Sequence, residues 1–334
     1  MFKIEIPSPD LKAKEIVKNN WASFNKNGFS LGVLERMVEK LAGMGELPES
    51  FNPGMVLMCG DHGVCKYGVS AFPQEVTLQM INGYMRGTAG ATVLARHAHA
   101  KVYVCDVGTA FDLSSMKNVY DYKVAWGTED FTKGPAMSEA QAIQAIEAGI
   151  KMAELCIDKG HNLLYTGEMG IGNTTATAAI AAAYLGIDSK LTVGRGSGIN
   201  DARLAIKQKV VADAINFNKP EQGNSMDVLT KVGGYDHAGL CGVILGAAAR
   251  KVPVMSDGVK ATAAAVRAYG FNPTCREYML CSHLSSDLSH RKMLEMLRLY
   301  PIIDAGMRLG EGTGASVAIP VLEAALKLYR TLVG

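Results

Sequence analysis

A glutamate inside a glycine-rich turn is the first place in this sequence where chemistry is indicated. Residues 162–177 read NLLYTGEMGIGNTTAT, an apolar run of strand type, then Gly167, Gly170 and Gly172, then an alanine-rich helix. A helix N-terminus behind such a turn attracts anions, because its backbone N–H dipoles converge and no Cβ blocks their approach. Glu168 would be out of place in a turn that only holds phosphate. Its carboxylate indicates a reaction centre, against the simpler alternative of a tight connection built from small residues.

We expect Asn173, Thr174 and Thr175 to cap the helix, because each side chain can accept a bond from the N–H groups of its first turn. Other polar side chains occupy the same position relative to their strands. The following residues come after the end of an expected strand: Asp61, His62, Asp106, Asp257, Ser285 and Glu311. In open α/β sheets this edge carries the binding crevice, so distant parts of the chain should face one pocket.

The elements that must position these residues alternate along the chain. We expect strands at 55–59, 101–107, 163–165, 252–255, 278–281 and 302–304. We expect two helices within 8–44, a helical stretch over 73–98 with a break near 87, and helices at 138–159, 201–217, 237–250 and after 312. This alternation predicts an α/β fold, a mostly parallel sheet with helices on both faces.

Composition excludes several classes of partner. The 34 basic and 32 acidic side chains nearly cancel and form no basic stripe, so we expect no nucleic acid partner. The seven dispersed cysteines are typical of reduced thiols in a cytoplasm. The first residues, MFKIEIPSPD, lack the apolar core of a signal peptide, and no apolar run approaches the roughly 20 residues of a membrane helix. We therefore expect a cytoplasmic protein without membrane contact.

Three familiar kinds of site fit poorly. No G-x-x-x-x-G-K-[ST] occurs, which excludes P-loop phosphoryl transfer. The segment 167–172 reads G-x-x-G-x-G, the dinucleotide fingerprint in the wrong order; Asp188 lies at the right distance, so a nicotinamide-dependent dehydrogenase stays as an alternative. The His-Asp neighbours at 61–62, 236–237 and 283–290 lack helical metal-ligand spacing, and we expect hydrogen-bonded structural groups and no metal site.

Six segments, in order along nearly the whole chain, resemble those of one enzyme family. They are GDHGV (60–64), PQEVT (73–77), TGEMGIGNTT (166–175), VGRGSGI (193–199), SDG (256–258) and RLGEGTGA (308–315). The family is nicotinate-nucleotide–dimethylbenzimidazole phosphoribosyltransferase, which assembles the lower ligand of cobalamin. GEMGIGNTT and GEGTGA carry most of the specificity, whereas GDHG alone would carry little.

The resemblance implies a reaction, a fold and an assembly. Members transfer the 5-phosphoribosyl group of nicotinate mononucleotide to an aromatic base, release nicotinate and form an α-ribotide, without a cofactor. Their fold is a Rossmann-like six-stranded parallel sheet with a small helical domain from both chain ends, here 1–45 with 312–334, beside a large domain over 46–311. Members are homodimers. A heterodimer with a paralogue, in which this chain is a non-catalytic partner subunit, stays as the alternative.

The resemblance also implies roles for individual residues. Glu311 matches the catalytic base, and Glu168 lies across the same pocket. The positions that match phosphoribosyl-binding residues are Gly170, Gly196, Lys207, Asp257, Gly258 and Ser285. The positions that match the lining of the base pocket are Phe72, Met80 and Leu309.

General chemistry agrees with these roles. One ring nitrogen of a benzimidazole attacks C1′ while the other loses a proton, which suits a partly desolvated carboxylate such as Glu311. Glycine N–H groups, Ser285 and Lys207 suit the 5′-phosphate. Simpler interpretations are that Glu311 only caps a helix and that Lys207 is a solvated lysine. The sequence leaves the acceptor open among dimethylbenzimidazole, other benzimidazoles, adenine and phenolic bases.

Overall fold

The computed structural model describes residues 3–24, 28 and 30–333. At its centre lies a six-stranded sheet with the order β3-β2-β1-β4-β5-β6, in which every pair is parallel. The strands are β1 (Pro53–Gly60), β2 (Lys101–Gly108), β3 (Val119–Asp121), β4 (Leu163–Met169), β5 (Val254–Ser256) and β6 (Met279–Cys281). The two central strands, β1 and β4, are buried along their whole length, as their apolar runs require.

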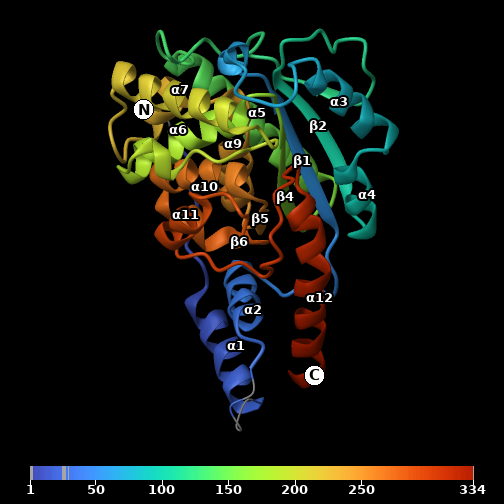
Figure 1. The fold of residues 1–334 in the computed structure, drawn as a ribbon. Helices are drawn as coiled ribbons and strands as arrows, with labels where there is room; N and C mark the ends of the chain where they lie inside the picture. The colour runs from blue at the N-terminus through green and yellow to red at the C-terminus, as the bar shows by residue number, and fades with distance from the viewer. Residues whose placement is uncertain (1–2, 25–27, 29, 334) are drawn as a thin grey trace.

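Helices cover both faces of this sheet, which confirms the predicted fold class (Figure 1). The α-helices of the described residues are α1 (Leu11–Phe24), α2 (Val33–Met44), α3 (Val76–Arg86), α4 (Gly90–His97), α5 (Glu139–Asp158), α6 (Asn173–Leu185), α7 (Asp201–Asn218), α8 (Ser225–Val232), α9 (Tyr235–Ala249), α10 (Val259–Phe271), α11 (His290–Leu297) and α12 (Thr313–Val333). Short 3₁₀ helices are η1 (Gly63–Tyr67), η2 (Ser189–Leu191) and η3 (Pro273–Tyr278). None of the helices in the described residues is long and apolar enough to span a lipid bilayer.

Helix α9 is buried on nearly all sides, and glycines allow α5 to pack closely against it. A Cβ at Gly149 of α5 would collide with the carbonyl of Gly239, and one at Gly242 with the carbonyl of Ile146. Because the two backbones nearly touch, only glycine fits at these contacts. The N-terminal end of α9 lies against the carboxyl ends of β1 and β2, since a Cβ at Gly60 would crowd Asp236 and one at Gly108 would collide with Tyr235.

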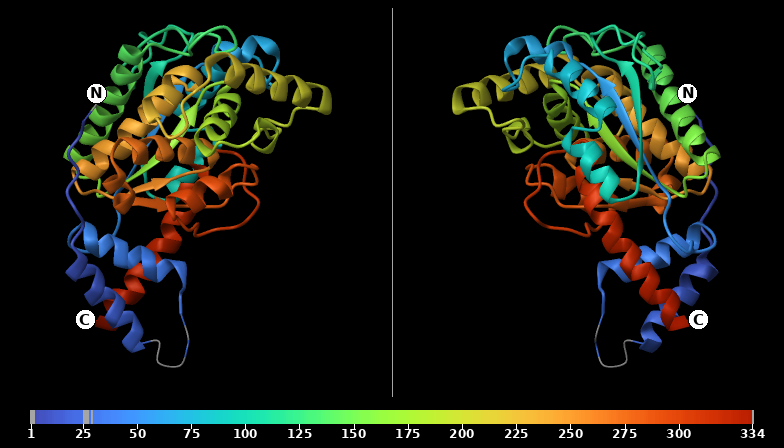
Figure 2. Two further views of the ribbon diagram at one scale, coloured as in Figure 1. Left: turned by 90° about the vertical axis from the view of Figure 1, so that its left-hand side faces the viewer. Right: turned by 90° about the vertical axis from the view of Figure 1, so that its right-hand side faces the viewer.

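Helices α1 and α2 and the second half of α12 form a three-helix group that projects away from the sheet (Figures 1 and 2). Its core includes Trp21 and Tyr329, whose rings lie 5.2 Å apart. Helix α12 begins at the sheet and ends in this group, so one helix connects the two. The domain bounds 1–45, 312–334 and 46–311 stay a prediction, and residues 1–2, 25–27, 29 and 334 lie outside the described residues.

The strand expected at 302–304 is wrong. That segment forms an isolated bridge between Ile303 and His283, with the N–H of Leu284 donating to the Ile303 carbonyl at 2.8 Å. The preceding Pro301 has no N–H to donate, and Asp304 is exposed. The apolar pair at 302–303 therefore lies beside the end of β6 without extending the ladder.

Candidate active site

The carboxyl ends of the strands open into a cavity of about 490 Å³. Most of the predicted site residues line it: Phe72, Met80, Glu168, Gly170, Gly196, Gly258, Ser285, Leu309 and Glu311. Lys207 and Asp257 are not among the lining residues. Glu168 and Glu311, far apart in the sequence, thus share one cavity: Glu168 lies at the end of β4, and Glu311 lies in the turn before α12.

The glycine turn leads from β4 into α6 at the floor of this cavity. A Cβ at Gly170 would collide with the carbonyl of Gly60, and Gly172 has a left-handed φ of +103° that turns the chain into the helix. The predicted side-chain cap is wrong, because the helix begins at Asn173 behind Gly172 and no side chain caps it. Instead, Asn173 donates to Glu168 and Thr174 accepts a bond from a lysine, so these side chains serve the cavity.

Glu168 is nearly fully buried and has three partners. Its Oε1 lies 2.7 Å from the Nζ of Lys260 and accepts the backbone N–H of Glu311 at 3.2 Å. Its Oε2 accepts a bond from the Nδ2 of Asn173 at 2.5 Å. Burial raises the pKa of the Glu168 carboxyl, and Lys260 opposes this shift. All three partners donate to Glu168, so the geometry favours the ionised carboxylate.

Glu311 lies in the middle of a left-handed turn, with φ values of +85° at Gly310, +60° at Glu311 and +81° at Gly312. The flanking glycines adopt this conformation without steric cost, whereas a residue with a Cβ loses about 1–2 kcal/mol there. The turn aims successive N–H groups at two carboxylates, that of Glu311 at Glu168 and that of Gly312 at Asp257. The strain is held in place by these two bonds.

The carboxyl group of Glu311 is mostly buried at the wall of the cavity. A polar neighbour of this group is the hydroxyl of Tyr84, but neither the buried Oε2 of Glu311 nor that hydroxyl makes a hydrogen bond of normal geometry among the described residues. Burial raises the pKa of Glu311 to about 7; Tyr84 partly opposes the shift and the Glu168 carboxylate adds to it. A carboxylate that titrates near neutrality is suited to accept a proton from a bound ligand.

Lys207 extends from α7 to a point behind the glycine turn. Its side chain is buried, and its Nζ donates to the Oγ1 of Thr174 at 2.8 Å. A Cβ at Gly196 would lie 3.1 Å from the same Nζ. Burial lowers the pKa of Lys207 to about 8, with Asp287 opposing. The simpler interpretation of a solvated lysine is therefore wrong, and the residue offers a positive charge directly behind two lining residues.

Asp257 occupies the N-terminus of α12 and does not reach into the cavity. Its Oδ1 accepts the N–H groups of Gly314 and Ala315 at 2.8 and 3.1 Å, and its Oδ2 accepts that of Gly312 at 3.1 Å. A carboxylate at this position satisfies amide donors that the helix leaves unpaired. In the structure Asp257 holds the turn that carries Glu311.

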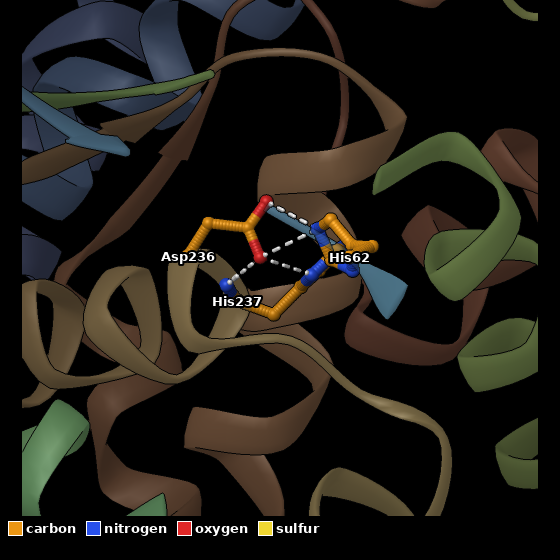
Figure 3. A group of neighbouring side chains, drawn as sticks. All are labelled: His62, Asp236 and His237. Atoms are coloured by element: carbon orange, nitrogen blue, oxygen red, sulfur yellow. Dashed lines mark hydrogen bonds and ion pairs between the residues drawn. The ribbon is translucent and has the colours of Figure 1, made fainter. Parts of the chain in front are cut away.

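His62, Asp236 and His237 form a buried cluster (Figure 3), and His62 lies against Gly172 of the glycine turn. One ligand atom from each lies within 4.8 Å of the others, and Asp236 already contacts His62 Nε2 at 3.2 Å and His237 Nδ1 at 2.9 Å. Burial would raise the pKa of Asp236, but the two histidines hold it well below its usual range. His237 also bonds Thr177, which donates to the carbonyl of Asn173, so the cluster supports the start of α6.

Sequence reasoning missed Lys260, Asn173 as a ligand of Glu168, and Tyr84. One signal for Lys260 was available: a lysine in the first turn of a helix opposes the helix dipole, so its place needs another reason. Tyr84 carried no signal, because an aromatic residue on an apolar helix face is ordinary core.

Comparisons with known proteins agree with this geometry. A family model described as "Phosphoribosyltransferase" matches residues 6–333. The nicotinate-nucleotide–dimethylbenzimidazole phosphoribosyltransferase of Desulforamulus reducens is 44% identical over 331 residues, which cover 98% of this chain and 94% of that protein. The enzyme of the same name from Chloroflexus aurantiacus is 45% identical over 321 residues, covering 96% and 92%. The crystal structure of the enzyme of that name from Thermus thermophilus matches with a TM-score of 0.90 and 36% identity, covering 96% of both chains. The chain belongs to the nicotinate-nucleotide–dimethylbenzimidazole phosphoribosyltransferase family.

Proposed function

We propose that this chain transfers the 5-phosphoribosyl group of nicotinate mononucleotide to dimethylbenzimidazole or a related aromatic base. The observation that carries the proposal is Glu311, a mostly buried carboxylate with a pKa of about 7, in one cavity with a glycine turn backed by a lysine. A proton acceptor and an anion-binding element in one cavity are what such a transfer requires.

The reaction balances without a cofactor. The unprotonated ring nitrogen of the base attacks C1′, the C1′–N bond to the pyridinium breaks, and that electron pair leaves with nicotinate. The product would carry a positive charge on its ring until the second nitrogen loses its proton, which Glu311 accepts. Because the leaving group is a cationic pyridinium, it departs as a neutral ring and needs no acid.

The other residues fit binding roles. We assign the 5′-phosphate to Gly170, Gly196, Gly258, Ser285 and the charge of Lys207 behind them. Phe72, Met80 and Leu309 supply apolar surface for the flat base. Glu168 lines the same cavity, and we assign its carboxylate to the stabilisation of positive charge that develops at C1′. Asp257 acts in this proposal through the turn that it holds.

The test is turnover by the purified chain alone, with nicotinate mononucleotide and dimethylbenzimidazole, scored by nicotinate release and by the mass of the product. Glu311→Gln should lower kcat by at least about a hundredfold, since general base catalysis contributes roughly 10²–10⁴. Glu154→Gln, at an exposed glutamate of α5, is the matched control and should not change the rate. Activity of Glu311→Gln within a few-fold of wild type would remove Glu311 from the mechanism.

The same preparation distinguishes the alternatives. A non-catalytic partner subunit would show no turnover until a second chain is added, and a dehydrogenase would bind NADH saturably. Asp188, which the dehydrogenase interpretation requires at a binding site, caps η2 and is not a lining residue of the cavity. We also propose a homodimer, for which light scattering should give about twice the 35.6 kDa of one chain.

A further inference from the structure

Lys260 reaches the cavity from the first turn of α10, and its Nζ lies 2.7 Å from the Oε1 of Glu168. The two side chains are 14% and 3% exposed, so little water screens the pair. Burial alone would lower the pKa of Lys260, but the Glu168 carboxylate raises it above its usual value. The lysine is therefore charged in a position where the helix dipole disfavours a cation, and helix stability does not explain it.

The ion pair supports the backbone immediately before Glu311. A Cβ at Gly310 would lie 2.6 Å from both the Oε1 of Glu168 and the Nζ of Lys260. The same Oε1 accepts the N–H of Glu311 at 3.2 Å. The left-handed turn at 310–312 thus rests directly on the pair, and the direction of the Glu311 side chain depends on it.

The charges of the pair also affect Glu311. Beyond the effect of burial, Glu168 raises the pKa of Glu311 and Lys260 lowers it. With both present, the pair is neutral overall, and Glu311 can lose its proton near neutral pH. Without the lysine, two carboxyls would share a poorly solvated site, and one of them would retain a proton to a higher pH.

We propose that Lys260 is a positioning residue for the transfer reaction, which keeps Glu168 ionised and thereby holds the Glu311 turn and leaves Glu311 free to accept the proton. The catalytic part of this inference rests on the proposed function. The ion pair itself is a property of the resting protein and can be tested without substrate.

The first test measures the melting temperature of Lys260→Met between pH 5 and pH 8, beside the double variant Lys260→Met/Glu168→Gln. The single variant leaves a buried carboxylate without its cation, so it should lose several degrees at pH 8 and less at pH 5, where Glu168 can take up a proton. The double variant lacks both charges and should show no such pH-dependent loss. Lys209→Met, at an exposed lysine of α7, is the matched control and should melt like wild type. A loss of melting temperature in Lys260→Met that is equal at both pH values would contradict the role of Lys260 in keeping Glu168 ionised.

The second test follows kcat for nicotinate release from pH 5.5 to 9. The acid limb of Lys260→Met should move upward by about one pH unit or more, the usual effect of removing an opposite charge from a carboxyl, and a shift of one unit alone lowers kcat at pH 7 about fivefold. An acid limb that stays at the wild-type position overturns the positioning role, even where the rate falls. If the wild-type chain itself releases no nicotinate, the proposed function fails, and the melting series decides the ion pair.

Discussion

The backbone N–H of Glu311 donates to the Oε1 of Glu168 at 3.2 Å, a bond between residues 143 positions apart. It joins the end of β4 to the turn before α12, so the Glu168 carboxylate supports the backbone that carries Glu311. The bond also brings two acidic groups together in a poorly solvated place. One of them, Glu168, is compensated by Lys260, and the other is left to titrate.

Glu311→Gln should make the free protein more stable at high pH. The pKa of Glu311 is raised from 4.5 to about 7 by burial, so the folded state binds its proton more tightly than the unfolded chain. Stability contributed by that proton is complete below pH 4.5 and is lost as pH rises through about 7. The neutral amide avoids this loss, and its free energy of unfolding should exceed that of wild type by roughly 2–3 kcal/mol at pH 8 and by little at pH 5. Denaturant melts at both pH values measure the difference, and an equal effect at the two would contradict the raised pKa.

The sheet and the edge that carries the cavity could be predicted from the sequence, because apolar strands and glycine turns leave local patterns. The apolar runs in β1 and β4 and the glycines at 170 and 172 are such patterns, although the strand β4 extends through Gly167 to Met169 and the turn is shorter than expected. The pairing of Lys260 with Glu168 leaves none, since it depends on β4 and β5 being neighbours and on two side chains meeting across them. From the sequence, Asn173 fits the pattern of a helix cap. In the structure the left-handed Gly172 takes the cap position, and the Asn173 side chain bonds Glu168 instead.

Gly310→Ala should disturb the site far more than an equivalent change nearby. Gly306 and Gly310 both have left-handed φ values, +64° and +85°, so alanine at either position should cost about 1–2 kcal/mol of stability. At Gly306 a Cβ meets nothing within 4 Å, whereas at Gly310 it would displace both Glu168 and Lys260. Gly306→Ala should therefore retain wild-type kcat, while Gly310→Ala should lose at least about tenfold, because small displacements of a catalytic group are costly. Equal kcat values for the two variants would show that the contact with the ion pair is immaterial.

Lys207→Ala should weaken binding of the nucleotide more than it slows the reaction. Its Nζ lies beside Thr174 and Gly196, where it can attract a 5′-phosphate in the ground state and transition state alike. Uniform binding of this kind lowers KM without changing kcat. We expect KM for nicotinate mononucleotide to rise about tenfold or more, with kcat within about threefold of wild type. Initial rates at varied nucleotide concentration measure both, with Lys209→Ala on the same helix as control; a loss confined to kcat would contradict the role as a phosphate handle.

The base pocket should distinguish poorly between rings that differ by methyl groups. Phe72 is 51% and Leu309 53% exposed, so a methyl placed against them leaves only part of its surface in contact with protein. Full burial of a methyl-sized group is worth about 0.8 kcal/mol, and half of that for each of two methyls amounts to less than about fivefold in kcat/KM.

A competition experiment with dimethylbenzimidazole, benzimidazole, adenine and a phenol, with products identified by mass, measures the discrimination directly. Benzimidazole and its dimethyl derivative should react within about tenfold of each other. A phenol presents oxygen as the attacking atom, and its proton must leave before or during attack. The reaction of a phenol should therefore depend more strongly on Glu311. A preference above about a hundredfold for the dimethyl compound would mean that its methyl groups are enclosed far more fully than these two side chains enclose them.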